Sequence, residues 1–340
     1  MRAAAYTGDG VVSVTDVTPT GPGPDDVVID VAYVGVCGTD LHIIHGAMDA
    51  RVRRPLVFGH EMSGTIREVG SNVSGWAEGD AVTVMPLEWD DTCPACHHGN
   101  QHICQNLNFI GIDSPGALQQ SWTVPASTLV PLPESLSLRT AALIEPVAVA
   151  VHDVRRSELR AGDHAVVIGG GPIGVLIASV ARQAGAAVVV LELDPARRRF
   201  IEQLGFTTVD PSATDATAWV EEWTGGAGAD VVFEVSGAAA AVRSATTFAR
   251  VRGTIVIVAI HPTPRELDLQ RVFWRELRIL GARVYQRIDF ERAIELLDSD
   301  AIDAEAVITS VHPLTHVGDA LTELQGGNAL KVLIDVQADA

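Results

Sequence analysis

The four cysteines of the chain fall into two groups that have the residue types of zinc sites. Cys37 opens the run Cys-Gly-Thr-Asp-Leu-His, and His60 and Glu61 follow in the run Gly-His-Glu. The other three have the spacing Cys-x2-Cys-x7-Cys, at Cys93, Cys96 and Cys104. Thiolate and imidazole are usual protein ligands of Zn²⁺, and a chain that leaves no cysteine over in this way predicts two zinc sites. The first group has the composition of an open catalytic site, and the second that of a closed structural site.

A glycine-rich turn predicts a second kind of chemistry, the binding of a dinucleotide. Three glycines stand in G-x-G-x-x-G spacing between an apolar strand and a helix, and the candidate cofactor contacts there are Gly169, Gly171, Pro172, Ile173 and Gly174. The first glycine permits a tight turn, the second lets the backbone approach a pyrophosphate, and the third lets helix and strand pack closely. The phosphates are expected at the N-terminus of the helix.

An acidic residue near the end of the next strand favours NAD over NADP. Glu192 stands where a carboxylate accepts hydrogen bonds from a ribose 2′-hydroxyl and repels a 2′-phosphate. Asp194 is a second candidate acid. The three arginines that follow could instead attract a phosphate, and we interpret this group mainly as a solvated helix face; Arg197 is kept as a candidate cofactor contact.

Two different patterns surround these motifs. Residues 1 to about 148 contain short β runs punctuated by Gly and Pro, at 27–36, 63–69, 81–85 and 122–125. From Asp163 onward, strands at 165–168, 187–193, 230–235 and 254–259 alternate with helices at 172–184, 195–204 and 238–250. Such alternation predicts an α/β fold with a parallel, doubly wound sheet. After Gly281 we expect helices at 290–297 and 315–324 and a last strand at 332–336.

The composition narrows the classes of function. A chain of 340 residues is long enough for two domains with separate cores. The net charge of -19 argues against nucleic acid and anionic membrane surfaces as partners, and no stretch approaches the roughly 20 apolar residues of a membrane span. The N-terminus has no apolar signal-peptide core, so we expect a cytoplasmic enzyme. Lys331 is the only lysine, which nearly excludes lysine-based catalysis unless this residue supplies it.

Taken together, these motifs resemble the zinc-dependent medium-chain dehydrogenases. The resemblance covers nearly the whole chain in the family's order, and it rests on the cysteine cluster and on the runs at 37–42, 59–64, 145–146 and 169–174. In the sorbitol, 2,3-butanediol and threonine dehydrogenase branch, a glutamate stands at the position of Glu145. The resemblance implies a GroES-like barrel catalytic domain at residues 1–148 and 287–340, and a Rossmann dinucleotide-binding domain at 149–286.

The same resemblance implies the ligands of both metal ions. At the catalytic zinc it implies Cys37 and His60, with either Glu61 or Glu145 as the third protein ligand. At the structural zinc the family uses four cysteines, and Asp90 stands here in place of the first one. Because a carboxylate can bind zinc, we expect a structural zinc at Asp90, Cys93, Cys96 and Cys104, although a remnant of three thiolates could also stay empty.

The resemblance implies hydride transfer from a secondary alcohol to NAD. Zinc acts as a Lewis acid on the substrate hydroxyl, and the roles carried over are Thr39 as relay hydroxyl, His42 as terminal base and Glu145 beside the metal. Phe109 and Tyr285 are candidate pocket residues. The expected substrate is a polyol or vicinal diol, with a hydroxy amino acid such as threonine as the alternative. From another class, the alternative is a non-catalytic nucleotide-binding or structural protein. The family implies a homodimer or homotetramer.

Overall fold

The two sequence patterns fold as two separate units in the computed structural model, which describes residues 1–327 and 329–338. The split unit consists of Met1–Glu145 together with the chain from Gln286 onward. The central unit consists of Pro146–Tyr285. Within the described residues, no helix of either unit is long and apolar enough to cross a bilayer.

The split unit is organised around β3 (Asp26–Val36), a largely buried strand in a seven-stranded sheet. One edge of β3 pairs along most of its length with β5 (Glu61–Val69). The other edge pairs first with β9 (Ser121–Pro125) and then with β18 (Lys331–Asp335). All three partners are antiparallel to β3. The near-continuous Val and Ile content of β3 follows from this central position, because such a strand has little contact with water.

The remaining elements of the split unit are mostly short. The main sheet is completed by β6 (Ala81–Val84), β10 (Leu129–Pro131) and β17 (Ile308–Pro313). Two smaller sheets hold β1 (Arg2–Gly8), β2 (Val11–Asp16) and β4 (Leu56–Val57), and β7 (Leu87–Glu88) with β8 (Asn108–Phe109). The helices are α1 (Gly38–Ile44), α2 (Pro94–His97), α3 (Leu138–Ala141), α10 (Arg287–Asp298), α11 (Ala304–Val307) and α12 (Val317–Gln325), with short 3-10 turns at Gln101–Ile103, Ala126–Thr128 and Leu314–His316.

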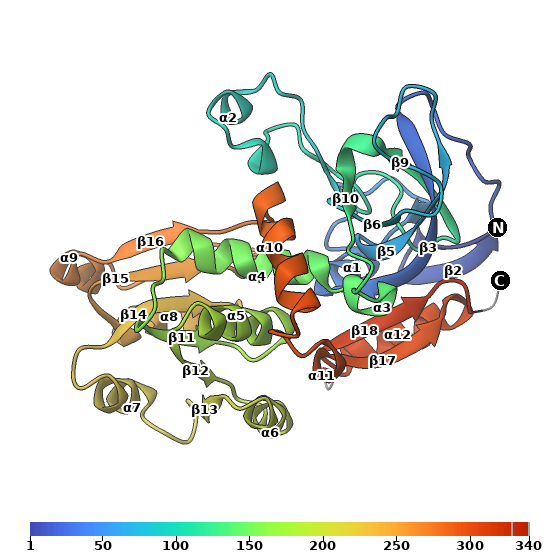
Figure 1. Ribbon diagram of the computed structural model, residues 1–340. Helices are drawn as coiled ribbons and strands as arrows, with labels where there is room; N and C mark the ends of the chain where they lie inside the picture. Colours follow the sequence, from blue (N-terminus) through green and yellow to red (C-terminus); the bar gives the residue numbers. More distant parts are fainter. Residues whose placement is uncertain (328, 339–340) are drawn as a thin grey trace. The chain divides into compact units, whose positions relative to one another are not determined.

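Parallel strands in the order β13-β12-β11-β14-β15-β16 form the sheet of the central unit (Figure 1). They are β11 (His164–Ile168), β12 (Ala187–Leu191), β13 (Thr207–Val209), β14 (Ala229–Glu234), β15 (Ala249–Ile257) and β16 (Arg278–Gly281). This is the order of a doubly wound nucleotide-binding sheet, which reverses between β11 and β14. Ligands of such sheets bind outside the carboxyl ends of the strands at the reversal, and the glycine-rich turn follows β11 at that point.

Helices α5 (Pro172–Gln183), α6 (Pro195–Gln203), α7 (Ala216–Trp223), α8 (Ala239–Phe248) and α9 (Leu269–Arg275) connect these strands, and α4 (Ile144–Ser157) precedes them. The predicted alternation of strands and helices is confirmed, and most predicted ends lie within two residues of those observed. The prediction was wrong at the start of β15, which begins at Ala249 rather than Thr254. Ala249 pairs there with Ala229 of β14 through a register shift. The edge strands β13 and β16 and helices α7 and α9 had no predicted counterpart.

Candidate active site and dinucleotide site

Three strand ends meet in the main sheet of the split unit and bring together residues far apart in the sequence. β3 ends at Val36, so Cys37 follows directly and caps helix α1. β5 begins at Glu61, which lies opposite Gly35 of β3. β18 begins at Lys331, next to the residue that pairs with Val36. A Cβ at Gly35 would overlap the carboxylate of Glu61, so this arrangement requires a glycine there.

Cys37, His60 and Glu61 form a cluster with the donor types of a zinc site. Their candidate ligand atoms all lie within 4.8 Å of one another. His60 and Glu61 are buried, and Cys37 is half-buried. A thiolate, an imidazole and one carboxylate, from either Glu61 or Glu145, suit Zn²⁺ with one position left for a substrate or water. The residues present therefore fit the catalytic zinc expected from the sequence.

The charges around His60 also fit a cation. Burial alone lowers the pKa of a histidine, but the hydrogen bond and charge of Cys37 and the charges of Asp40 and Glu145 raise the pKa of His60 to about 10. Asp40 is fully buried, and its burial is the main cause that raises its own pKa to about 6. Its Oδ2 accepts a hydrogen bond from the backbone N–H of Cys37 at 2.8 Å, and its Oδ1 lies 3.8 Å from Nδ1 of His60. Asp40 is thus placed to orient both residues.

Lys331 is the residue at this site to which the motifs assigned no role. Its Nζ donates to both carboxylate oxygens of Glu61, at 2.7 and 2.6 Å, and to the carbonyl oxygen of Val36 at 3.4 Å. Burial lowers the pKa of a lysine, yet the negative charges of Glu61 and Cys37 leave the pKa of Lys331 raised above its ordinary value. The signal in the sequence was a lone lysine beside the apolar residues of the last strand.

The other predicted catalytic residues lie on two helices. Glu145 is buried in the first turn of α4; it does not belong to the 4.8 Å cluster, but its charge acts on His60. Thr39 and His42 stand three residues apart on α1, which places them on one face of the helix. The backbone N–H of Thr39 donates to Sγ of Cys37 at 3.5 Å, and His42 is exposed. Helix α1 therefore runs from the half-buried thiol to an exposed histidine.

Of the two predicted pocket residues, Phe109 contacts His60 of the candidate zinc-ligand cluster. Its ring packs edge-on against the ring of His60, with centroids 5.3 Å apart. Phe109 lies on the short strand β8 and is buried. Tyr285 is completely buried at the end of the central unit.

The second cysteine group folds into a compact loop that includes α2. Sγ of Cys93 lies 3.5 Å from Sγ of Cys96 and 3.7 Å from Sγ of Cys104, and all three thiols are buried. Asp90 completes a group whose ligand atoms lie within 4.8 Å of one another. Hydrogen bonds from the side chain of Asn106 and from two backbone N–H groups hold the pKa of Asp90 well below its ordinary range. An ionised carboxylate beside three thiols fits a closed zinc site.

The glycine-rich turn has the shape of a pyrophosphate cradle. Gly169 has a φ of 109°, a conformation in which side chains are strained. A Cβ at Gly174 would overlap the carbonyl oxygen of Gly169, so helix and turn pack too closely for a side chain. Gly171 precedes α5 without capping it by a side chain. Apart from its two chain neighbours, no described residue has an atom within 4 Å of the position of a Cβ there. Pro172 and Ile173 begin the helix, whose N-terminus can therefore receive an anion.

Glu192 lies just beyond β12 and is fixed next to this turn. One carboxylate oxygen accepts a hydrogen bond from the backbone N–H of Gly170 at 2.7 Å, and the other accepts one from the backbone N–H of Asp194 at 2.8 Å. Asp194, the second candidate acid, uses its own carboxylate to cap the start of α6. Glu192 is thus the acid that is held against the glycine-rich turn.

The arginines after Asp194 differ in their surroundings. Arg198 forms an ion pair with Asp210 at 3.0 Å and donates to the carbonyl oxygens of residues 192 and 193. Arg197 is half-buried in the first turn of α6, and Arg199 is exposed. Arg198 is therefore already occupied by protein partners.

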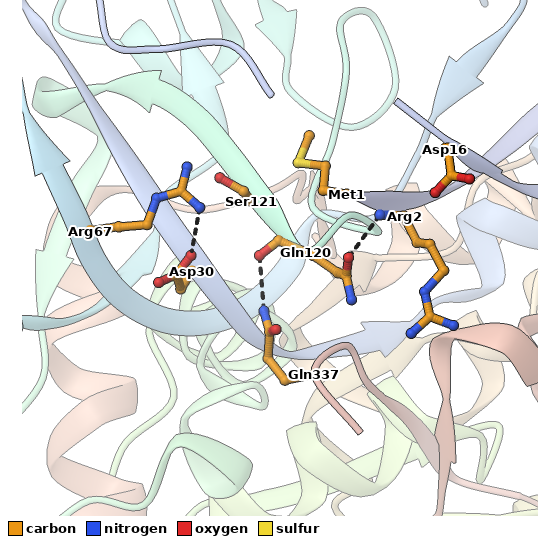
Figure 2. A pocket seen from close by; sticks show the side chains of 8 residues that line it. All are labelled: Met1, Arg2, Asp16, Asp30, Arg67, Gln120, Ser121 and Gln337. Atoms are coloured by element: carbon orange, nitrogen blue, oxygen red, sulfur yellow. Dashed lines mark hydrogen bonds and ion pairs between the residues drawn. The ribbon is translucent and has the colours of Figure 1, made fainter. Parts of the chain in front are cut away.

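A separate hollow of about 360 Å³ on the split unit contains none of the predicted site residues (Figure 2). It is lined by Met1, Arg2, Asp16, Asp30, Arg67, Gln120, Ser121 and Gln337. Several of its polar groups pair with one another: Arg67 donates to Asp30 at 3.2 Å, and Gln337 donates to the carbonyl oxygen of Gln120 at 2.9 Å. We assign no activity to this hollow.

Comparisons with known proteins agree with the chemistry of both sites. Residues 23–134 match the alcohol dehydrogenase GroES-like domain, and residues 172–299 match the zinc-binding dehydrogenase family. The chain is 50% identical to the 2-dehydro-3-deoxy-L-galactonate 5-dehydrogenase of Pseudoalteromonas atlantica, over 100% of both chains. The chain belongs to the zinc-dependent medium-chain dehydrogenases.

Two further relatives support the same assignment. A sorbitol dehydrogenase of Halalkalibacterium halodurans is 31% identical over 98% of this chain and 99% of its own. The crystal structure of a zinc-binding dehydrogenase from Sinorhizobium meliloti 1021, bound to NADP, matches with a TM-score of 0.92 and 33% identity over 98% of this chain and 99% of its own. The predicted family and the predicted fold class, a doubly wound domain plus a GroES-like domain, are confirmed. This dehydrogenase uses zinc and a nicotinamide dinucleotide to oxidise or form a secondary alcohol.

Proposed function

We propose that this dehydrogenase acts on a secondary hydroxyl of a polyhydroxylated sugar acid. The polyol type of substrate expected from the sequence agrees with both the sugar-acid dehydrogenase and the sorbitol dehydrogenase among its relatives. The observation that favours the acid is the 50% identity over the full length of the sugar-acid dehydrogenase, against 31% for the sorbitol dehydrogenase. Neutral polyols and vicinal diols are the second candidate class, supported by the sorbitol dehydrogenase.

The split unit supplies the groups that would hold the metal. Cys37 and His60 are two of the ligands, and we assign the third to Glu145, because both oxygens of Glu61 already accept hydrogen bonds from Lys331. Bound there, zinc supplies Lewis acidity to the substrate hydroxyl. Glu61 then contributes a negative charge that Lys331 balances, and it stays beside the site without being a ligand.

Helix α1 offers a route for the proton of the substrate hydroxyl. In this assignment the hydroxyl of Thr39 would lie next to the reacting oxygen, accept its proton and release its own toward His42. His42 would then pass a proton to solvent. Both residues lie on one face of the helix, and His42 is exposed. Asp40, a buried residue of the same helix, holds Cys37 and His60 in place through the contacts described above.

We assign NAD as the preferred dinucleotide. The carboxylate of Glu192, fixed by the N–H of Gly170, would accept hydrogen bonds from a ribose 2′-hydroxyl and repel a 2′-phosphate. Arg198, which could neutralise that phosphate, is paired with Asp210. The NADP bound to the Sinorhizobium relative means that family membership alone does not decide the cofactor. The preference in this chain depends on these side chains.

We assign the catalytic role to the split unit and dinucleotide binding to the central unit. Asp90, Cys93, Cys96 and Cys104 would hold a second, structural zinc, supported by their mutual distances. The cysteines are all unpaired, and thiols that are kept for metal rather than for disulfides support a cytoplasmic location.

We also propose a homo-oligomer that forms at the outer edge of β16. In the described chain, no strand pairs with that edge of the sheet (Figure 1). Phe273 and Trp274, on the helix that precedes β16, are 73% and 72% exposed. An open strand edge and exposed aromatic side chains mark a surface that another chain covers, and a second copy would give a closed two-fold contact. Trp274→Glu should therefore lower the molar mass measured by light scattering, and an unchanged mass would contradict this interface.

The substrate proposal is tested by following NADH formation across a panel of alcohols. The panel contains 2-dehydro-3-deoxy-L-galactonate and other sugar acids, their neutral polyol counterparts, the 2,3-butanediol isomers and threonine. Sugar acids should give the highest kcat/KM. A matched comparison is an aldonic acid against the alditol of the same stereochemistry, because that pair differs only in the carboxylate, which is a hydroxymethyl group in the alditol.

The other possible results of this panel distinguish the alternative substrate classes. Turnover confined to neutral polyols or diols would reject the sugar acid and retain the polyol class. Turnover confined to threonine would reject both. No turnover across the panel, from enzyme that demonstrably contains zinc and binds NADH, would reject the proposed substrate class altogether.

A further inference from the structure

Glu234, which is buried, and His261, which is half-buried, form an acid–histidine pair at the carboxyl end of the central sheet. Glu234 is the last residue of β14 and is completely buried, and His261 follows the end of β15 with a side chain that is 16% exposed. Nε2 of His261 lies 3.2 Å from Oε2 of Glu234. Among the described residues, Oε2 and both ring nitrogens have no hydrogen bond of normal geometry. The contact is therefore close but not aligned as a hydrogen bond.

The other oxygen of Glu234 holds the loop that lies against the dinucleotide turn. Oε1 accepts hydrogen bonds from the backbone N–H of Ser236 at 3.1 Å, from its hydroxyl at 2.8 Å and from the backbone N–H of Gly237 at 2.9 Å. Ser236 in turn packs on the first glycine of the turn, because a Cβ at Gly169 would lie 3.1 Å from the Cβ of Ser236. Glu234 thus connects β14 to the cradle proposed for the pyrophosphate.

The strand order shows on which half of the proposed dinucleotide site Glu234 and His261 lie. A doubly wound sheet consists of two halves that each take one mononucleotide. β11, β12 and β13 form the half that carries Glu192, the acid assigned to the adenosine ribose. β14, β15 and β16 form the other half, which is left for the nicotinamide. Glu234 and His261 lie at the carboxyl ends of two of these strands, the edge at which the ligand binds.

We propose that the buried carboxylate of Glu234 shifts the affinity of this site toward the oxidised dinucleotide. The nicotinamide ring carries a positive charge when oxidised and none when reduced, so a fixed negative charge on this half of the site would favour binding of the oxidised form. One unit charge within a Debye length, at an effective dielectric constant of about 20, changes an affinity by roughly tenfold. A tenfold change corresponds to about 30 mV in the potential of a bound two-electron couple. The inference rests on the proposed dinucleotide site, and it makes Glu234 a positioning residue that acts through its charge and through the loop.

The test measures binding rather than turnover. The full-length protein is titrated with NAD+ and with NADH, and the ratio of the two dissociation constants is compared between variants. Glu234→Gln keeps the size of the side chain and an oxygen for the loop but removes the charge, so the preference for NAD+ over NADH should fall roughly tenfold. His261→Gln disrupts the same pair but keeps the carboxylate, so this preference should not fall.

A matched control is available on the same strand. Asp230 also lies near a histidine, with Oδ2 3.9 Å from Nδ1 of His164, but it stands at the amino end of β14. Asp230→Asn should leave the ratio of dissociation constants unchanged. His261→Lys gives a test that does not depend on the folding of Glu234→Gln, because an ammonium beside the intact carboxylate should also lower the preference for NAD+.

Several results would overturn the inference. An unchanged ratio in Glu234→Gln or in His261→Lys would exclude the charge effect. Equal losses of NAD+ and NADH affinity in Glu234→Gln and His261→Gln would mean that the pair only supports the loop. A wild-type protein that binds neither form would instead reject the proposed cofactor site, so the two failures are distinguishable.

Discussion

Replacement of Lys331 by methionine should strongly destabilise the split unit, because it leaves the carboxylate of Glu61 buried without its partner. Both side chains are almost completely buried, and the two N···O distances are 2.6 and 2.7 Å. Removal of one member of a buried ion pair costs roughly 3–5 kcal/mol. In a unit of about 200 residues, each kcal/mol lowers the melting temperature by roughly 2–4 °C, so the expected fall is about 10 °C. Calorimetry of the full-length protein would measure it.

An exposed ion pair serves as the matched control. Arg278 donates to both carboxylate oxygens of Glu158, at 2.8 and 3.0 Å, but both side chains are exposed. Because exposed pairs contribute about 0–1 kcal/mol, Arg278→Met should have little effect. The double variant Lys331→Met/Glu61→Gln should recover much of the lost stability, since no buried charge is left unpaired. The reasoning is refuted if Lys331→Met melts like Arg278→Met, or if the double variant is as unstable as Lys331→Met.

The pH dependence of stability gives an independent check that the ion pair of Lys331 with Glu61 stabilises the folded protein. Burial lowers the pKa of Lys331, but the charges of Glu61 and Cys37 leave it raised. A group whose folded-state pKa is raised contributes stability that is complete below the unfolded value, about 10.4 for lysine, and that is lost as the pH rises through the folded value. The difference in melting temperature between wild type and Lys331→Met should therefore stay constant from about pH 7 to 9 and narrow only at more alkaline pH.

Three further substitutions test the metal and cofactor assignments. Cys37→Ala should abolish turnover and remove one zinc per chain while NADH binding is kept, and a fully active variant would contradict the catalytic site. Asp90→Ala should remove the other zinc and make the three clustered thiols react faster with a thiol reagent; an unchanged zinc content would show that Asp90 is not a ligand. Glu192→Gln keeps an acceptor for the N–H of Gly170 but removes the charge, so kcat/KM for NADP should rise relative to NAD by roughly tenfold. An unchanged cofactor ratio would reject the role given to Glu192.

The features that could be predicted from the sequence are those whose causes are local. The glycine spacing and Pro172 define the turn and the first residue of α5, because both act within a few residues of themselves. The start of β15 was misplaced because it depends on pairing with β14, which local pattern does not reveal. The ion pair of Lys331 with Glu61 joins residues 270 positions apart, and the sequence showed only that the chain has a single lysine. No motif near either residue specifies the other.

The choice between Glu61 and Glu145 illustrates the same limit at the metal site. Both are buried carboxylates whose charges act on Lys331. Residue type alone therefore cannot show which of the two is the zinc ligand. The fold distinguishes them through β18, which pairs with the end of β3 and delivers an ammonium to Glu61. The surroundings of the proposed metal site therefore include a residue of the strand that follows the whole central unit. The positions of Cys37, His60, Glu61 and Glu145 in the sequence do not reveal this contact.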